Sequence, residues 1–88
     1  MDVLGAKARL TDLAESVSDR LTLEQRGWLG DLLRAGEVEV GLEMLADWLA
    51  EDEHPLSAEE RREALALAEE LGVPEGVEGA LAFCPERP

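Results

Sequence analysis

The chain has 88 residues, enough for one domain with a modest core, because a chain of this size buries only about 60–65% of its unfolded surface. Hydrophobic residues make up 45% of the chain but aromatic residues only 3%, which favours helices, because strands prefer β-branched and aromatic residues. The formal net charge of −13 argues against binding to nucleic acid or to an anionic membrane and favours a basic partner.

The chain has a single cysteine, Cys84, so it can form neither an internal disulfide nor a paired-cysteine metal site. The absence of paired cysteines favours a reducing compartment. The N-terminal stretch has an acid at position 2 and no long apolar run, so we expect neither a signal peptide nor a membrane helix. The sequence therefore predicts a cytoplasmic protein. Among the basic residues Arg far outnumbers Lys, and with the many Ala and Leu residues this is typical of a GC-rich bacterial genome.

The first expected helix runs from Val3 to Leu21, where apolar residues recur at the spacing of one helical face. That face comprises Val3, Ala6, Leu10, Leu13, Ala14, Val17 and Leu21. Thr22 and Gln25 follow in the capping-box pattern, in which each side chain satisfies an exposed backbone amide. A second helix therefore starts there and ends at Gly36, and we expect its Trp28 to lie in the core with Leu29, Leu32 and Leu33.

A third helix opens at Glu37, with acids in its first turn, where the helix dipole stabilises them. Its expected inward face is narrow and comprises Val38, Leu42, Leu45 and Leu49. The run from Glu51 to Pro55 ends this helix and forms a loop.

A fourth helix begins at a second capping box, Ser57 with Glu60, and runs to Leu71, where Gly72 closes it. The stretch 77–81 could form one short helix, and residues 84–88 are expected to be a flexible tail. The sequence therefore predicts an all-α fold, a compact bundle of four helices with this short C-terminal addition, in a single domain over residues 1–88.

The third helix carries the main anomaly of the sequence, because residues 37–53 hold seven carboxylates and no Lys or Arg. Four of them follow at four-residue spacing along the side opposite the core face: Glu39, Glu43, Asp47 and Glu51. Each such like-charge pair destabilises an isolated helix by about 0.2–0.5 kcal/mol, and a basic partner would remove the repulsion. The alternative is an acidic solvated surface without a specific partner.

Two apolar residues, Met44 and Trp48, flank this stripe on one edge. Trp is enriched at binding hot spots, although in so small a protein it also serves the core, so Trp48 fits either place. The predicted partner-binding residues are therefore Glu37, Glu39, Glu43, Met44, Asp47, Trp48 and Glu51.

Catalysis finds little support in the sequence. His54 is the only histidine, and no Ser or Cys can be matched to it by pattern. Cys84 has no basic neighbour that would lower its pKa, and the Asp and Gly spacing of a calcium loop is absent. We therefore expect no enzymatic activity, no metal, no cofactor and no small-molecule ligand.

The segment from Gly36 to Glu51 resembles the Maf-type immunity proteins of bacterial polymorphic toxin systems. In that family a Gly-Glu pair opens a helix that then carries a small residue, Leu and Glu, which here are Gly41, Leu42 and Glu43. The resemblance continues through Leu56 and Ser57 into the fourth helix and covers about the second half of the chain.

The resemblance implies an immunity protein that binds the toxic C-terminal domain of a secreted effector. Toxins of such systems are often nucleases, whose cationic substrate groove an acidic domain can cover. A second hypothesis is an acidic adaptor or regulatory subunit that docks on a basic protein in a cytoplasmic complex.

Overall fold

The computed structural model describes residues 3–87, without the side chain of Val3, so that Met1, Asp2 and Pro88 of the expected domain lie outside the described residues. Within this range the chain is all helical and has no β-strand. The helices are α1 Val3–Ser16, the short 3-10 helix η1 Ser18–Arg20, α2 Leu23–Arg34, α3 Val38–Glu51, α4 Ala58–Leu71 and α5 Pro74–Leu81. The all-α prediction is confirmed, and the short C-terminal helix is α5.

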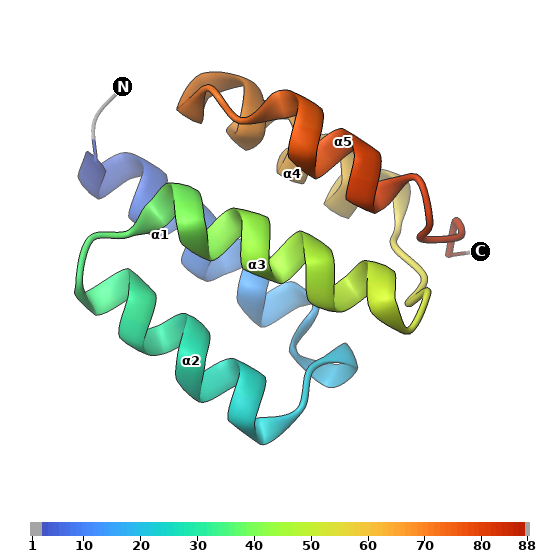
Figure 1. Ribbon diagram of the computed structural model, residues 1–88, viewed down its shortest axis with the longest axis horizontal. Helices are drawn as coiled ribbons and strands as arrows, with labels where there is room; N and C mark the ends of the chain where they lie inside the picture. Colours follow the sequence, from blue (N-terminus) through green and yellow to red (C-terminus); the bar gives the residue numbers. More distant parts are fainter. Residues whose placement is uncertain (1–2, 88) are drawn as a thin grey trace.

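The helices form two layers (Figure 1). Helix α3 lies in the middle of the nearer layer, between α2 on one side and α5 on the other, while α1 and α4 lie behind. The shortest extent of the molecule is 18 Å, which has room for two layers, because packed helices lie about 8–10 Å apart. Helix α3 therefore buries one side against the rear layer and turns the opposite side outward.

Local sequence signals set the starts of α2 and α4 and the end of α4 as expected. The Gln25 amide donates to Thr22 Oγ1 at 3.0 Å and the Thr22 amide donates to Gln25 Oε1 at 3.0 Å, which completes the first capping box. Ser57 and Glu60 form the second capping box in the same way. Gly72 ends α4 with a φ of 78°, a left-handed conformation that only glycine adopts without strain.

The core lies between the two layers, and the predicted inward face of α3 is buried as expected. Leu42 and Leu45 are each 1% exposed, and Gly41 lets α3 approach its neighbours closely. A Cβ added at Gly41 would lie 3.3 Å from methyl groups of both Leu10 and Leu29, closer than ordinary van der Waals contact. Helix α3 is thus the central element against which α1, α2 and α5 pack.

Shortening the central side chain of this face should destabilise the protein strongly. We expect Leu45→Ala to lower the free energy of unfolding by about 2–5 kcal/mol, because the variant loses buried apolar surface and leaves a cavity. Urea denaturation measures the loss. Met44→Ala, one position away and 38% exposed, is the matched control and should cost clearly less. Equal losses in the two variants would show that Leu45 does not face the core.

Two expectations from the sequence are wrong. Helix α1 ends at Ser16 rather than continuing to Leu21, because the chain tightens into η1, where the Arg20 amide bonds to the Val17 carbonyl at 2.9 Å. Trp28 is 58% exposed rather than in the core. On α2 only Leu29 and Leu33 are buried, so the buried face of this helix is narrower than its apolar residues predicted.

The last described residues, within the stretch expected to be a flexible tail, make specific contacts. Cys84 is 4% exposed and belongs to the core. The Leu56 amide donates to the Pro85 carbonyl at 2.9 Å, and the Arg87 amide donates to the Leu56 carbonyl at 2.7 Å. These contacts hold residues 84–87 against the loop between α3 and α4.

Candidate protein-binding surface

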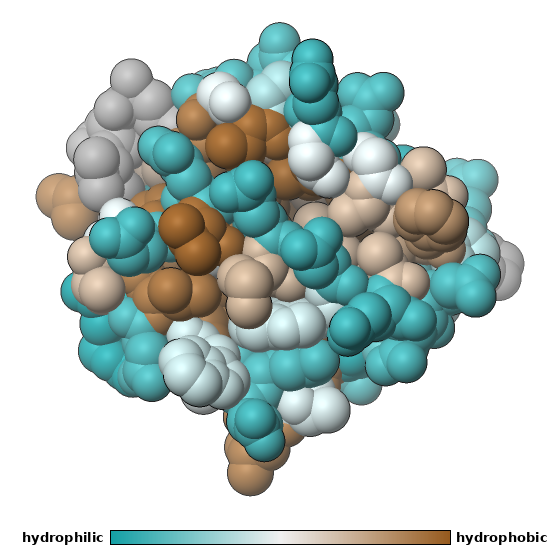
Figure 2. Space-filling model, viewed as in Figure 1, coloured by the Kyte–Doolittle hydropathy of each residue, from teal (hydrophilic) through white to brown (hydrophobic). Residues whose placement is uncertain are grey.

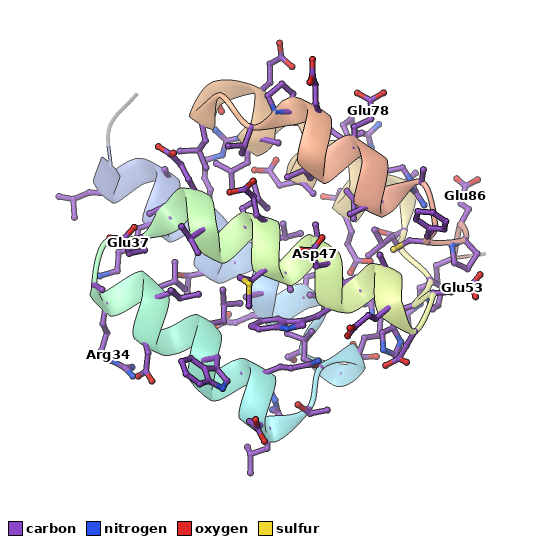
Figure 3. The ribbon with its side chains drawn as sticks, viewed as in Figure 1. Arg34, Glu37, Asp47, Glu53, Glu78 and Glu86 are labelled. Atoms are coloured by element: carbon purple, nitrogen blue, oxygen red, sulfur yellow. The ribbon has the colours of Figure 1, made fainter. Side chains whose placement is uncertain are left out.

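The predicted binding residues lie on α3 and at its N-cap. All five carboxylates are exposed, namely Glu37, Glu39, Glu43, Asp47 and Glu51. Figure 3 shows Glu37 at one end of α3, Asp47 on the outward side of the helix, and Glu53 just beyond its other end. Exposed acids thus occur along the whole length of α3.

These carboxylates have no partner within residues 3–87. None of the five forms an ion pair or a side-chain hydrogen bond with any described residue. Helix α4 is a contrast, because its Glu63 and Glu70 both pair with Arg9 of α1. The negative charge of α3 is therefore uncompensated within the part of the chain that the structure describes.

The fold divides the predicted residues among four places. Glu37 and Glu39 line a hollow that α1 and α4 help to form, together with Ala6 and Leu71. Glu43 faces α5, since a Cβ added at Gly76 would lie 3.6 Å from Glu43 Oε2. Met44, Trp48 and Glu51 lie on the side of α3 toward α2, whereas Asp47 lies on the outward side of the helix.

Met44, Trp48 and Glu51 line a groove between α3 and α2. The residues that complete it come from the start of α2 and are Thr22, Glu24, Gln25 and Trp28. This α2–α3 groove has a volume of about 420 Å³. Trp48 is partly buried and packs against the core, and it also lines this groove. The groove thus combines two indole rings and a thioether with two carboxylates.

Helix α5 extends the acidic surface. Glu75 and Glu78 lie on this helix, which carries no basic residue, and both are exposed. Figure 3 shows Glu78 on the edge of α5 that faces away from α3, the neighbouring helix in this layer. Figure 2 shows a hydrophilic band that crosses this face of the molecule diagonally between apolar patches. The surface is therefore mixed, with charge and exposed apolar area side by side.

The sequence predictions missed the residues of α2 that line the groove, Glu24 and Trp28. A signal for them exists in the sequence. Trp28 stands eight residues before Gly36 and Met44 eight residues after it. In an antiparallel pair of helices joined by a short turn, residues equally far from the turn lie at the same level. This spacing, applied to the predicted turn at Gly36, places Trp28 opposite Met44.

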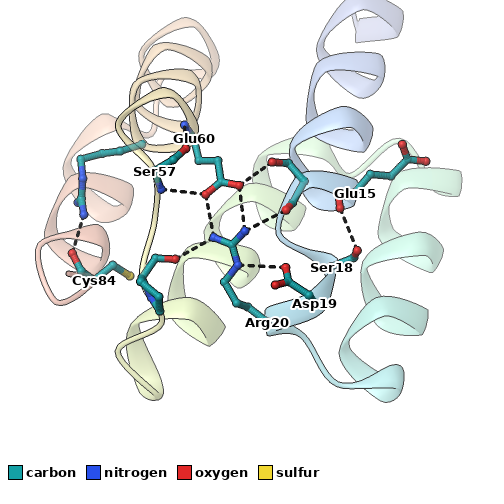
Figure 4. A network of polar contacts seen from close by, with 10 residues as sticks. Glu15, Ser18, Asp19, Arg20, Ser57, Glu60 and Cys84 are labelled. Carbon is teal, nitrogen blue, oxygen red and sulfur yellow. Dashed lines mark hydrogen bonds and ion pairs between the residues drawn. The ribbon is translucent and has the colours of Figure 1, made fainter. Parts of the chain in front are cut away.

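A second polar cluster joins η1 to the start of α4 (Figure 4). Both Arg20 and Glu60 are almost fully buried, with side chains 7% and 9% exposed. Two guanidinium nitrogens of Arg20 donate to the two Glu60 oxygens at 2.7 and 3.0 Å, and the Ser16 hydroxyl donates to the same carboxylate at 2.6 Å. Arg20 also donates to the Pro55 carbonyl at 2.8 Å. No buried side-chain nitrogen or oxygen of the described residues lacks a hydrogen-bond partner, so this network stabilises the contact between η1 and α4.

The buried carboxylate makes stability depend on pH. Hydrogen bonds from Arg20 lower the pKa of Glu60 from 4.5 to about 2, against the opposing effect of burial. Because the pKa of Glu60 is lower in the folded state than in the unfolded state, its ionised carboxylate contributes its full stabilisation above pH 4.5. This contribution is lost as pH falls toward 2. We compare the unfolding free energy of the protein with that of the Glu60→Gln variant. The difference between them should decrease by roughly 3 kcal/mol as pH falls across this range. Urea denaturation at a series of pH values measures the difference, and a constant difference below pH 4.5 would contradict the prediction.

The remaining candidates for chemistry are placed as follows. Burial raises the pKa of the Cys84 thiol, against the opposing effect of the Arg61 charge. His54 Nε2 lies 3.7 Å from Asp52 Oδ2 in the loop after α3. Among residues 3–87, no three His, Cys, Asp or Glu side chains come together in a way that could hold a metal ion.

The fold and this surface define a small all-helical protein with an uncompensated acidic face and an aromatic groove beside it. None of its described helices has the length and apolar character needed to span a membrane. Comparison with protein families, with curated proteins and with solved structures gave no match. The resemblance to Maf-type immunity proteins therefore rests on the sequence pattern of the second half of the chain.

Proposed function

We propose that this protein is an immunity protein, which binds a cognate bacterial toxin domain and neutralises it through the outward side of α3. The observation that carries the proposal is the set of exposed α3 carboxylates that have no partner among the described residues. Like charges at this spacing repel one another, and no described Lys or Arg relieves the repulsion. A basic partner relieves it, and complementary charge raises the rate of association.

A basic nuclease domain fits this surface best among toxin activities. A nuclease binds phosphates through a cationic groove, and a row of carboxylates presents a similar density of negative charge. Glu39, Glu43 and Asp47 serve as electrostatic contacts along α3, while Met44 and Trp48 provide apolar area for tight packing. On this proposal the toxin is held with its substrate site covered, in the cytoplasm of the producing cell.

Co-expression tests the proposal directly. The protein is produced in a bacterial host together with the basic C-terminal domain encoded by its neighbouring gene, and growth is compared with that of cells that produce the C-terminal domain alone. We expect growth to stop with the domain alone and to be restored by the pair. The purified pair should form a stable complex that weakens as salt is raised.

The result that overturns the immunity proposal is equally clear. If the neighbouring domain is not toxic, or its toxicity is unchanged by co-expression, the protein is not its immunity partner. A salt-sensitive complex with a non-toxic basic protein would instead identify the adaptor or regulatory subunit, which is the second hypothesis from the sequence. The same acidic residues would then serve a different partner.

A further inference from the structure

The α2–α3 groove contains both tryptophans of the chain. Trp28 is 58% exposed, and Met44, which also lines the groove, is 38% exposed. Exposure of large apolar side chains to water is unfavourable. Single exposed apolar residues are common, but several in one groove are typical of a binding site. Trp28, Met44 and Trp48 therefore form an apolar surface in the groove on which a partner can pack.

Two carboxylates border the same groove. Glu24 lies in the first turn of α2 and Glu51 in the last turn of α3, and neither forms an ion pair with another described residue. The basic residues of α2 are directed elsewhere. Arg26 lines a separate hollow between α1 and α2, and Arg34 pairs with Asp31. The charge of the groove is thus negative, and no Lys or Arg of residues 3–87 lines it.

We propose that this groove binds an arginine side chain of the partner protein. A guanidinium group is flat and stacks on indole rings, where the attraction between cation and ring is worth about 0.5–2 kcal/mol. Its five N–H groups can donate to carboxylates at the border while its methylene stem lies on Met44 and the indoles. A second copy of this chain does not fit the groove as well, because two molecules of net charge −13 repel each other.

This inference deepens the proposed function, on which it rests for the basic character of the partner. It adds Trp28 and Glu24 of α2 to the binding surface and names the kind of side chain that the groove selects. The acidic side of α3 would attract many basic proteins, whereas a groove that holds one arginine requires that residue at one place. The groove is therefore the part of the surface that gives specificity.

The chain contains its own reporter for this test. It has two tryptophans, both of which line the groove, and no tyrosine, so its tryptophan fluorescence reports on the groove. The probe is a short arginine oligomer, titrated into the protein at low salt. A lysine oligomer and a citrulline oligomer of the same length are the comparisons, since citrulline has the shape of arginine without its charge.

We expect a saturable change of tryptophan fluorescence with the arginine oligomer, weaker binding of the lysine oligomer, and no change with the citrulline oligomer. Glu24→Gln combined with Glu51→Gln should weaken binding of the arginine oligomer by about tenfold. The matched control is Asp12→Asn combined with Glu69→Gln, which removes the same charge from exposed positions on α1 and α4. The control should weaken binding by less than about twofold.

Equal weakening by the two double variants would overturn the inference, because it would show that only the net charge matters. An unchanged fluorescence with all three oligomers would overturn it as well. The proposed function fails separately, in the co-expression test. If the toxin complex forms and the Glu24 and Glu51 variant binds the toxin normally, the groove inference fails while the immunity function stands.

Discussion

Reversing two charges on α3, with Glu43→Lys and Asp47→Lys together, should slow association with the partner by about 10- to 100-fold at low salt. Both carboxylates are exposed and neither has a partner in the described chain, so their replacement leaves the core intact. The association rate is measured by stopped flow over a range of salt concentrations. At about 1 M salt, where the Debye length is about 3 Å, the difference should largely disappear.

The matched control reverses two exposed acids of the rear layer, Asp12→Lys with Glu69→Lys, which changes the net charge equally. If α3 is the contact surface, this control should slow association far less. Equal slowing by both double variants would indicate long-range attraction without a specific site. Thermal unfolding of each variant shows that the fold is retained.

Removing the buried cation at η1 should have the largest effect on stability among the polar residues. We expect Arg20→Ala to lower the unfolding free energy by about 3–5 kcal/mol, because it leaves the Glu60 carboxylate buried without its ion-pair partner. The variant also loses the hydrogen bonds that Arg20 gives to the carbonyls of Pro55 and Ser16. Denaturation by urea at neutral pH measures the loss.

Arg34→Ala provides the comparison for this variant. Arg34 also pairs with a carboxylate, Asp31, but the two side chains are 71% and 66% exposed. Exposed pairs of this kind contribute only about 0–1 kcal/mol. If both arginine variants lose a similar amount of stability, then burial of the Arg20–Glu60 pair has no energetic consequence and the prediction is wrong.

Local signals in the sequence predicted most of the fold. The two capping boxes fixed the starts of α2 and α4, and Gly72 fixed the end of α4, because each depends on residues within a few positions of the helix end. The inward face of α3 could be predicted because the apolar residues of that helix follow a narrow stripe, which allows a single orientation.

What the sequence did not predict depends on contacts between distant residues. Glu60 could be recognised as a capping residue, but its pairing with Arg20 joins positions 40 residues apart, and no local pattern indicates it. The exposure of Trp28 is a similar case. The apolar side of α2 is wide enough to include Trp28, and only the packing of α2 against α3 decides which part of that side is covered.

The candidate site divides in the same way. The exposure of the α3 acids followed from the orientation of the helix, whereas the groove needed the position of a neighbouring helix. Counting outward from Gly36 would have placed Trp28 beside Met44, as the structure does. The contribution of Glu75 and Glu78 could not be found by counting, because α5 reaches α3 only through the fold.

The buried Arg20–Glu60 pair has a consequence for protein engineering. It holds η1 and α4 together with side chains that take no part in the outward surfaces of α2, α3 and α5. A library of variants randomised only at exposed positions of those three helices would keep the Arg20–Glu60 pair and the apolar core unchanged. Such a library should yield many well-folded members, and this small chain could serve as a scaffold from which binders of new specificity are selected.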